Sequence, residues 1–245
     1  MTEVAIGRDA GASAESAAEL FVEAAAGAVA ARGKALIALT GGSSASAFYA
    51  ALRSPRWKER VPWEKLQLFL GDERAVSTTD PASNFAMVER ELLRQVPVGP
   101  AQVHRFRGEA KDLEAEAARA AEELSLIAGE PPRLDLMLLG LGVDGHILSL
   151  FAGVPSSGER GDRALVLQVA APLSVEPRVA RLTMTPFLAV TARMVVLSTA
   201  GEKKAAVLAR ALKGPEDLVA CPAQWLRRAA GRVVVLADPA AASGL

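Results

Sequence analysis

Short apolar runs of strand length alternate with longer segments in which apolar residues recur at helical spacing along almost the whole chain. Residues 14–31, for example, place Phe21, Val22 and Ala25 on one helical face, and the run at 35–40 that follows is short and mostly apolar. This alternation is typical of parallel strands joined by crossover helices, so it predicts an α/β fold with an open, mostly parallel sheet and helices on both faces. Strands are expected at 35–40, 66–70, 134–139, 164–169, 178–183, 193–198 and 232–237, and helices at 14–31, 44–53, 83–95, 111–128, 202–212 and 222–230.

The sequence gives no sign of separate units along the chain. No run of Pro, Gly or Ser has the length of a linker, and there is no repeat of fixed period. With 245 residues, 51% of them apolar and 23% charged, the composition is that of a packed globular chain. We therefore expect a single domain over residues 1–245, with a mobile surface loop at 153–163 (GVPSSGERGDR).

The charge balance argues against partners that are recruited by a strong overall field. Lys plus Arg and Asp plus Glu number 28 each, so neither nucleic acid nor an anionic membrane is an expected partner. No apolar stretch approaches the roughly 18 residues that a membrane helix needs. The N-terminal residues lack the basic start and apolar core of a signal peptide, and Cys221 is the only cysteine. These features predict a cytoplasmic protein, a monomer or small homo-oligomer.

Three of the predicted strands run into polar loops that contain glycine, at residues 40–46, 71–76 and 140–146. In an open α/β sheet, ligands bind in the crevice outside the carboxyl ends of the strands. We therefore look for function in these three loops.

The first loop has the features of a phosphate cradle. Gly41 and Gly42 let backbone N–H groups approach an anion, and Ser43 lies where a helix N-terminus adds partial positive charge. A tight turn with Ser43 or Ser44 as the N-cap explains the same residues. The loop lacks the lysine of a nucleoside-triphosphate P-loop.

The second loop places two acids and an arginine directly after a strand: Asp72, Glu73 and Arg74. Adjacent residues alternate in direction along an extended chain, so at least part of the trio projects into the crevice. An exposed charged turn is the alternative.

The third loop ends in His146, one of only two histidines in the chain. We expect this imidazole at a strand-to-helix junction, facing the crevice, where it can act as a general base near neutral pH. Asp144 is expected either to orient the imidazole or to shape the turn. The other histidine, His104, lies in an apparent strand and is expected to be structural.

The same loop formally matches the dinucleotide fingerprint G-x-G-x-x-G at residues 140–145. A nicotinamide cofactor site is therefore an alternative. Against it, the match falls in the middle of the chain, and the next predicted strand ends without an acidic residue to bind a ribose.

Three motifs taken together resemble the 6-phosphogluconolactonases, which share a fold with the glucosamine-6-phosphate isomerases/deaminases. These are L-T-G-G-S-S at 39–44, L-G-D-E-R-A-V at 70–76 followed by Ser83-Asn84, and L-G-L-G-V-D-G-H-I-L-S-L-F at 139–151. Order and spacing agree across nearly the whole chain. The deaminases read like A-F-N-E-P after the histidine and D-E-Y in the second loop, so this chain is more similar to the lactonases.

The resemblance implies hydrolysis of 6-phospho-D-glucono-1,5-lactone to 6-phosphogluconate, the second step of the oxidative pentose phosphate pathway, with a small-molecule substrate and neither metal nor cofactor. It implies His146 as the general base, while Asp72 and Glu73 hydrogen-bond sugar hydroxyls or hold the cations of the site. An amino-sugar phosphate deaminase and a non-catalytic sugar-phosphate sensor remain alternatives. The residues implied to bind the phosphate are Gly41, Gly42, Ser43, Arg74, Arg181 and Lys204.

Overall fold

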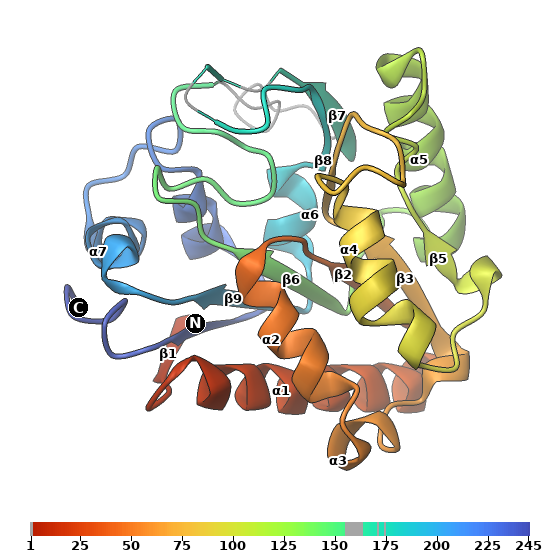
Figure 1. Ribbon diagram of the computed structural model, residues 1–245, viewed down its shortest axis with the longest axis horizontal. Coiled ribbons are helices and arrows are strands. Elements are labelled where there is room, and N and C mark those ends of the chain that lie inside the picture. The colour runs from red at the N-terminus through yellow and green to blue at the C-terminus, as the bar shows by residue number, and fades with distance from the viewer. Residues whose placement is uncertain (1, 155–163, 171, 174) are drawn as a thin grey trace.

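The computed structural model describes residues 2–154, 164–170, 172–173 and 175–245, and within this part the chain forms two β-sheets with helices around them (Figure 1). The larger sheet has seven strands among the described residues, and all neighbouring pairs are parallel. The predicted fold class, an open and mostly parallel sheet, is therefore confirmed. The strands, in spatial order, are β1 (Thr2–Ile6), β10 (Arg232–Ala237), β9 (Met194–Thr199), β6 (Leu136–Gly140), β2 (Ala35–Leu39), β3 (Leu66–Leu70) and β5 (Val103–His104).

The smaller sheet begins directly after β3, the strand next to β5 at one side of the larger sheet. Only Gly71 separates β3 from β4 (Asp72–Arg74), which pairs antiparallel with β8 (Arg181–Met184). That strand pairs in turn with β7 (Val166–Val169). The predicted strands at 164–169 and 178–183 thus exist, but they belong to this antiparallel sheet.

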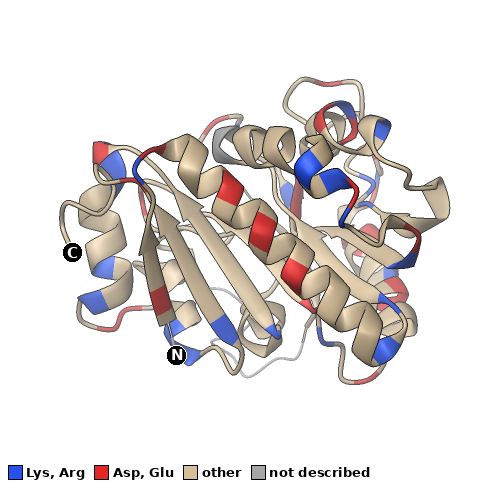
Figure 2. Ribbon diagram, turned by 90° about the horizontal axis from the view of Figure 1, so that it is seen from below, with Lys and Arg blue, Asp and Glu red and all other residues tan. Residues whose placement is uncertain are grey.

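The longest helix, α1, has clear sequence signals at both ends. Asp9 caps its first turn by accepting a hydrogen bond from the Ala12 backbone N–H at 2.8 Å, and Gly33 ends it with φ +75°. The helix packs against β2, β6, β9 and β10, and acidic positions lie along its outer face (Figure 2). The helices are α1 (Ala10–Arg32), α2 (Ser43–Leu52), α3 (Pro55–Lys58), α4 (Asn84–Glu91), α5 (Leu113–Ala128), α6 (Pro186–Thr191) and α7 (Ala205–Lys213).

Several 3₁₀ turns stand where the sequence predicted longer helices. The predicted helix at 222–230 is the 3₁₀ segment η6 (Pro222–Arg228), and the predicted helix at 83–95 ends as α4 at Glu91, followed by η2 (Leu93–Gln95). The start of the predicted helix at 202–212 is η5 (Glu202–Lys204), which leads into α7. Two other short turns in the described residues are η1 (Trp63–Lys65) and η3 (Pro100–Gln102).

The order of the strands places a crevice near the middle of the sheet. From β2 the chain proceeds to β3 and β5 on one side, then returns to β6 on the other side of β2. The loops after β2 and β6 therefore flank a topological switch point, the usual place for a ligand in such a sheet. The chain also brings the ends of β3 and β9 to the same edge.

Two further expectations concern the surface loop at 153–163 and the absence of a membrane helix. Most of the predicted surface loop at 153–163 lies outside the described residues. No helix in the described part of the chain has the length and apolar character needed to cross a membrane.

Candidate active site

A cleft of about 550 Å³ opens at the carboxyl ends of β2, β3, β6 and β9. It is lined by residues from all three loops that the sequence analysis singled out, together with residues from β8 and η5. The residues predicted for the site that line it are Gly41, Gly42, Asp72, Arg74, His146, Arg181 and Lys204.

At position 41 the loop after β2 lies directly against the buried side chain of Asn84, which any Cβ would displace. A Cβ on Gly41 would lie 1.9 Å from the Oδ1 atom of Asn84. Gly42 has φ +90° and is the N-cap of α2, so the alternative with Ser43 or Ser44 as N-cap is wrong. The side chain of Ser43 is outside what the structure describes. The amino end of α2 begins beside the cleft, as a phosphate cradle requires.

Asp72 and Arg74 share one face of β4, and both line the cleft. The Asp72 carboxylate is held from two directions: Ser149 Oγ donates to Oδ2 at 2.6 Å, and Asn84 Nδ2 donates to Oδ1 at 3.0 Å. Asn84 Nδ2 also donates to the Asp72 backbone carbonyl at 2.9 Å. Asp72 is therefore a fixed acceptor at the cleft wall.

Glu73 points to the opposite side of β4 and does not line the cleft. Its side chain is 2% exposed, and burial raises the pKa of its carboxyl. The carboxylate accepts hydrogen bonds from the backbone N–H groups of Arg74, Asn84 and Phe85 and from the Ser83 hydroxyl, at 2.7–2.9 Å. The expectation that Glu73 contacts substrate hydroxyls does not fit this placement, because its carboxylate oxygens already accept hydrogen bonds from these four groups, three of which lie at the start of α4.

Arg74 and Arg181 lie directly opposite each other in the antiparallel pair of β4 and β8. Arg181 is 2% exposed and donates to the carbonyls of Pro177 and Val179, while Arg74 donates to the Ala82 carbonyl at 2.7 Å. Burial, followed by the charge of Arg74, lowers the pKa of Arg181. Neither guanidinium forms an ion pair with a described acidic residue. Because like charges across a strand pair repel, this arrangement favours an anion between them.

Lys204 contributes a third cation from η5, where sequence analysis had expected the first turn of a helix. Its Nζ donates to the Leu141 carbonyl at 2.6 Å. Burial lowers the pKa of this lysine, and the charge of Asp144 opposes the shift. No acidic residue in the described ranges forms an ion pair with Lys204, whereas its neighbour Lys203 is exposed.

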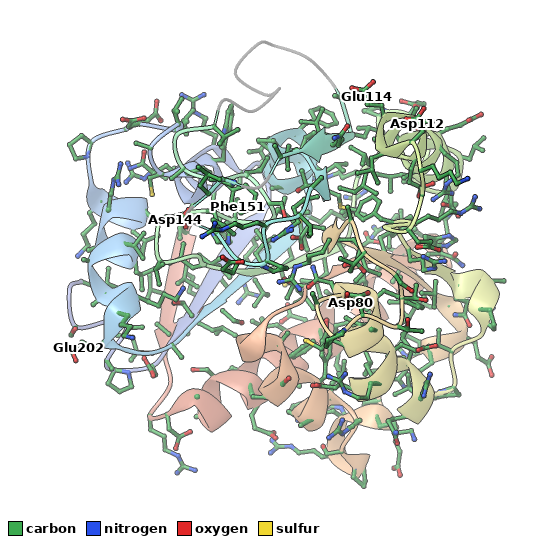
Figure 3. All side chains as sticks on the ribbon, turned by 45° about the horizontal axis from the view of Figure 1, so that its top comes forward. Asp80, Asp112, Glu114, Asp144, Phe151 and Glu202 are labelled. Atoms are coloured by element: carbon green, nitrogen blue, oxygen red, sulfur yellow. The ribbon has the colours of Figure 1, made fainter. Side chains whose placement is uncertain are left out.

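His146 and Asp144 form a close pair at the other side of the cleft. The Nδ1 atom of His146 lies 2.6 Å from Asp144 Oδ1. Partial burial raises the pKa of Asp144, but the hydrogen bond and the charge of His146 outweigh it and bring the pKa to about 2. Phe151 packs its ring against the imidazole with 5.3 Å between centroids. Figure 3 labels Asp144 and Phe151 on the ribbon.

The geometry of the His146 loop (residues 140–146) disagrees with a dinucleotide site. Gly142 N–H donates to the His146 carbonyl, and a Cβ on Gly142 would lie 2.1 Å from the imidazole Nδ1. In the described residues 141–154 no helix follows, so the expected strand-to-helix junction is also wrong. Gly142 leaves room for the imidazole, and the loop presents no helix N-terminus to a pyrophosphate.

Three further residues line the cleft, Asn84, Ser149 and Phe151, which the sequence offered only as parts of the motifs that carry the resemblance. Asn84 and Ser149 act through contacts with Asp72 in another segment, and Phe151 acts through its contact with His146. His104 contacts Glu123 at 2.9 Å and Gln67 at 2.7 Å and is outside the cleft, in agreement with a structural role. Within the described residues, no cluster of three or more His, Cys, Asp or Glu is arranged to bind a metal ion.

Comparison with known proteins supports the resemblance over the whole length. The chain is 35% identical to a 6-phosphogluconolactonase of Streptomyces coelicolor, covering 99% of this chain and 94% of that one. It is 36% identical to a 6-phosphogluconolactonase of Synechocystis, covering 89% and 88%. A solved 6-phosphogluconolactonase from Trypanosoma brucei superposes with a TM-score of 0.86 at 27% identity, over 100% of this chain and 99% of that one.

A solved monomeric glucosamine-6-phosphate deaminase superposes equally well, with a TM-score of 0.86, but at 21% identity. This second likeness shows a shared fold alone. Residues 8–235 match the family described as "Glucosamine-6-phosphate isomerases/6-phosphogluconolactonase". The chain therefore belongs to the glucosamine-6-phosphate isomerase/6-phosphogluconolactonase family.

Proposed function

We propose that the protein is an enzyme that hydrolyses 6-phospho-D-glucono-1,5-lactone to 6-phospho-D-gluconate. One observation carries the proposal: three cations without a described acidic partner line the same cleft as His146, whose Nδ1 atom contacts Asp144. The cations suit a phosphate dianion and the His–Asp pair suits the activation of water. The names of the relatives with 30% identity or more support the same substrate.

The phosphate is bound by Arg74, Arg181 and Lys204 together with the amino end of α2. Guanidinium groups bind phosphate oxygens through paired hydrogen bonds, and the lysine adds a compact charge. A dianion between Arg74 and Arg181 would also relieve their mutual repulsion. Asp72 accepts a hydrogen bond from a sugar hydroxyl, which sets the orientation of the ring.

His146 is the general base in this proposal. Because Asp144 is ionised, Nδ1 donates to it, and the lone pair of the neutral imidazole is then on Nε2. Nε2 takes a proton from water while the water oxygen bonds to C1 of the lactone. The tetrahedral intermediate collapses with cleavage of the bond between C1 and the ring oxygen, which receives the proton from Nε2. The resulting carboxylic acid ionises and releases one proton to solution.

The apolar contact of Phe151 supports a lactonase over an amino-sugar deaminase. The deaminase-like motif has a glutamate after the histidine, whereas here an aromatic ring lies against the imidazole. We also propose a cytoplasmic location, and a monomer or small homo-oligomer that acts without nucleic acid, on the basis of zero net charge and the free, buried thiol of Cys221.

The proposal is tested by replacing the two histidines separately. With freshly prepared phosphogluconolactone, and with spontaneous hydrolysis subtracted, His146→Gln should reduce kcat by about 10²-fold or more, the scale of a positioned base. His104→Gln is the matched control and should keep kcat within about twofold, because it removes an imidazole outside the cleft. Near-normal turnover in His146→Gln would remove this residue from the mechanism.

The two alternative functions, a deaminase and a sugar-phosphate sensor, give different results when assayed with the same protein. Ammonia release from glucosamine 6-phosphate would identify a deaminase. Binding of 6-phosphogluconate without lactone hydrolysis would identify a sensor.

A further inference from the structure

The peptide that supports the catalytic imidazole is held by a residue of the anion site. In the His146 loop, Gly142 lies directly under the imidazole, and the preceding carbonyl, that of Leu141, accepts the hydrogen bond from Lys204 Nζ at 2.6 Å. Lys204 therefore contacts the backbone at Leu141, one residue before Gly142, on which the imidazole of His146 packs.

The rest of this loop is held by contacts that do not involve the anion site. Gly142 N–H donates to the His146 carbonyl at 2.8 Å, and Ala223 N–H donates to the Gly145 carbonyl at 2.9 Å. The Leu141 carbonyl is thus the point at which a charged group of the cleft reaches the loop. An ammonium group has three donors, so two of the Lys204 N–H bonds remain for an anion.

The two arginines of the anion site have no such connection. Arg74 donates to the Ala82 carbonyl, and Arg181 donates to the carbonyls of Pro177 and Val179. These acceptors lie in the loops that follow β4 and precede β8. The arginines can hold a phosphate without touching the His146 loop.

We propose that Lys204 is a positioning residue that couples occupation of the anion site to the placement of His146, so that the phosphate group of the substrate accelerates hydrolysis as well as anchoring the molecule. A bound dianion compensates the half-buried ammonium charge and fixes it between the anion and the Leu141 carbonyl. The His146 loop is then held in its working position. Binding energy from a remote part of the substrate is used in this way to order the reacting groups. The inference rests on the proposed lactonase activity.

The test separates the phosphate from the lactone. Unphosphorylated glucono-1,5-lactone is the substrate, phosphite dianion is the probe, and spontaneous hydrolysis is subtracted. In the native protein, saturating phosphite should raise kcat/KM for this substrate by about tenfold or more, because the dianion supplies the missing contact with Lys204.

Two methionine variants distinguish coupling from anchoring. Lys204→Met should show no acceleration even at saturating phosphite. Arg74→Met, the matched loss of one cation, should require more phosphite but reach the native maximal acceleration. In ¹⁵N spectra the imidazole signal of His146, assigned with the His104→Gln variant, should shift on addition of phosphite in the native protein and in Arg74→Met, and should not shift in Lys204→Met.

Each remaining outcome overturns the inference. Phosphite that competes with phosphogluconolactone but does not accelerate glucono-1,5-lactone would show that the cations only anchor. Full acceleration in Lys204→Met would assign the coupling to another residue, and absence of any competition would refute the anion site. Failure of the native protein to hydrolyse phosphogluconolactone is a separate result, which would instead contradict the proposed function.

Discussion

At the scale of single residues, the Asp144 carboxylate has the environment of a permanent anion. Its pKa falls from 3.8 to about 2, although partial burial acts in the opposite direction. The cause is the short hydrogen bond and the charge of His146. Asp144 thus remains ionised at every pH at which the enzyme is expected to work, and it fixes Nδ1 as the donor of the imidazole.

This predicts a stability effect with a definite sign. A carboxyl whose pKa is lower in the folded state stabilises the protein above its unfolded pKa and loses that contribution as the pH falls through the folded value. The native protein should therefore exceed Asp144→Asn in free energy of unfolding by up to about 1 kcal/mol at pH 5, a figure reduced for solvent screening of a partly exposed pair. The difference should shrink as the pH approaches 2. Urea titrations of both proteins across this range measure it, and a difference that grows on acidification would contradict the assignment.

At the scale of elements, the alternation along β4 explains both a success and an error of sequence reasoning. Asp72, Glu73 and Arg74 follow a buried strand, which located them correctly at the edge of the sheet. Because the chain stays extended, the middle residue, Glu73, points to the opposite face of β4. Of these three residues only Asp72 and Arg74 line the cleft, so the assignment of Glu73 to the site does not fit the structure. The alternation of side chains along an extended strand was the signal that could have excluded Glu73 from the cleft.

Other elements lacked a local signal. The sequence did not predict β1. None of the residues of this strand is buried, so it lacks the apolar run that is typical of a core strand. The antiparallel pairing of β4 with β8 joins segments about a hundred residues apart, and the opposition of Arg74 and Arg181 depends on that register. Sequence resemblance supplied Arg181, while spacing along the chain did not.

The buried side of β4 gives a prediction about the start of α4. All four groups that contact the Glu73 carboxylate are donors, so Glu73→Gln turns an amide NH₂ toward other donors. The free energy of unfolding should fall by about 1–3 kcal/mol, the cost of unsatisfied buried groups. Glu89→Gln, the same substitution at a partly exposed position of α4, should change it by less than about 0.5 kcal/mol. Denaturant titration compares the two, and equal effects would show that Glu73 does not support the helix.

At the scale of the whole molecule, three cations from separate segments line one cleft of a chain with zero net charge. Arg74, Arg181 and Lys204 come from three segments that the strand order brings to the same edge of the sheet. The loops after β2 and β6 close the cleft on either side of the switch point, so the anion site and His146 face a common space. Hydrolysis of a phosphorylated lactone in this cleft requires that the anion site and the base lie together in this way.

The role of the phosphate is measured by comparing kcat/KM for phosphogluconolactone and for glucono-1,5-lactone without added anions. The native protein should prefer the phosphorylated substrate by about 10²-fold or more, the effect of two or more charge-assisted hydrogen bonds. Arg181→Met should lose most of this preference, and Lys203→Met, which removes an exposed cation next to the site, should retain it. Equal efficiency of the native protein on the two lactones would show that the three cations do not bind the phosphate of the substrate.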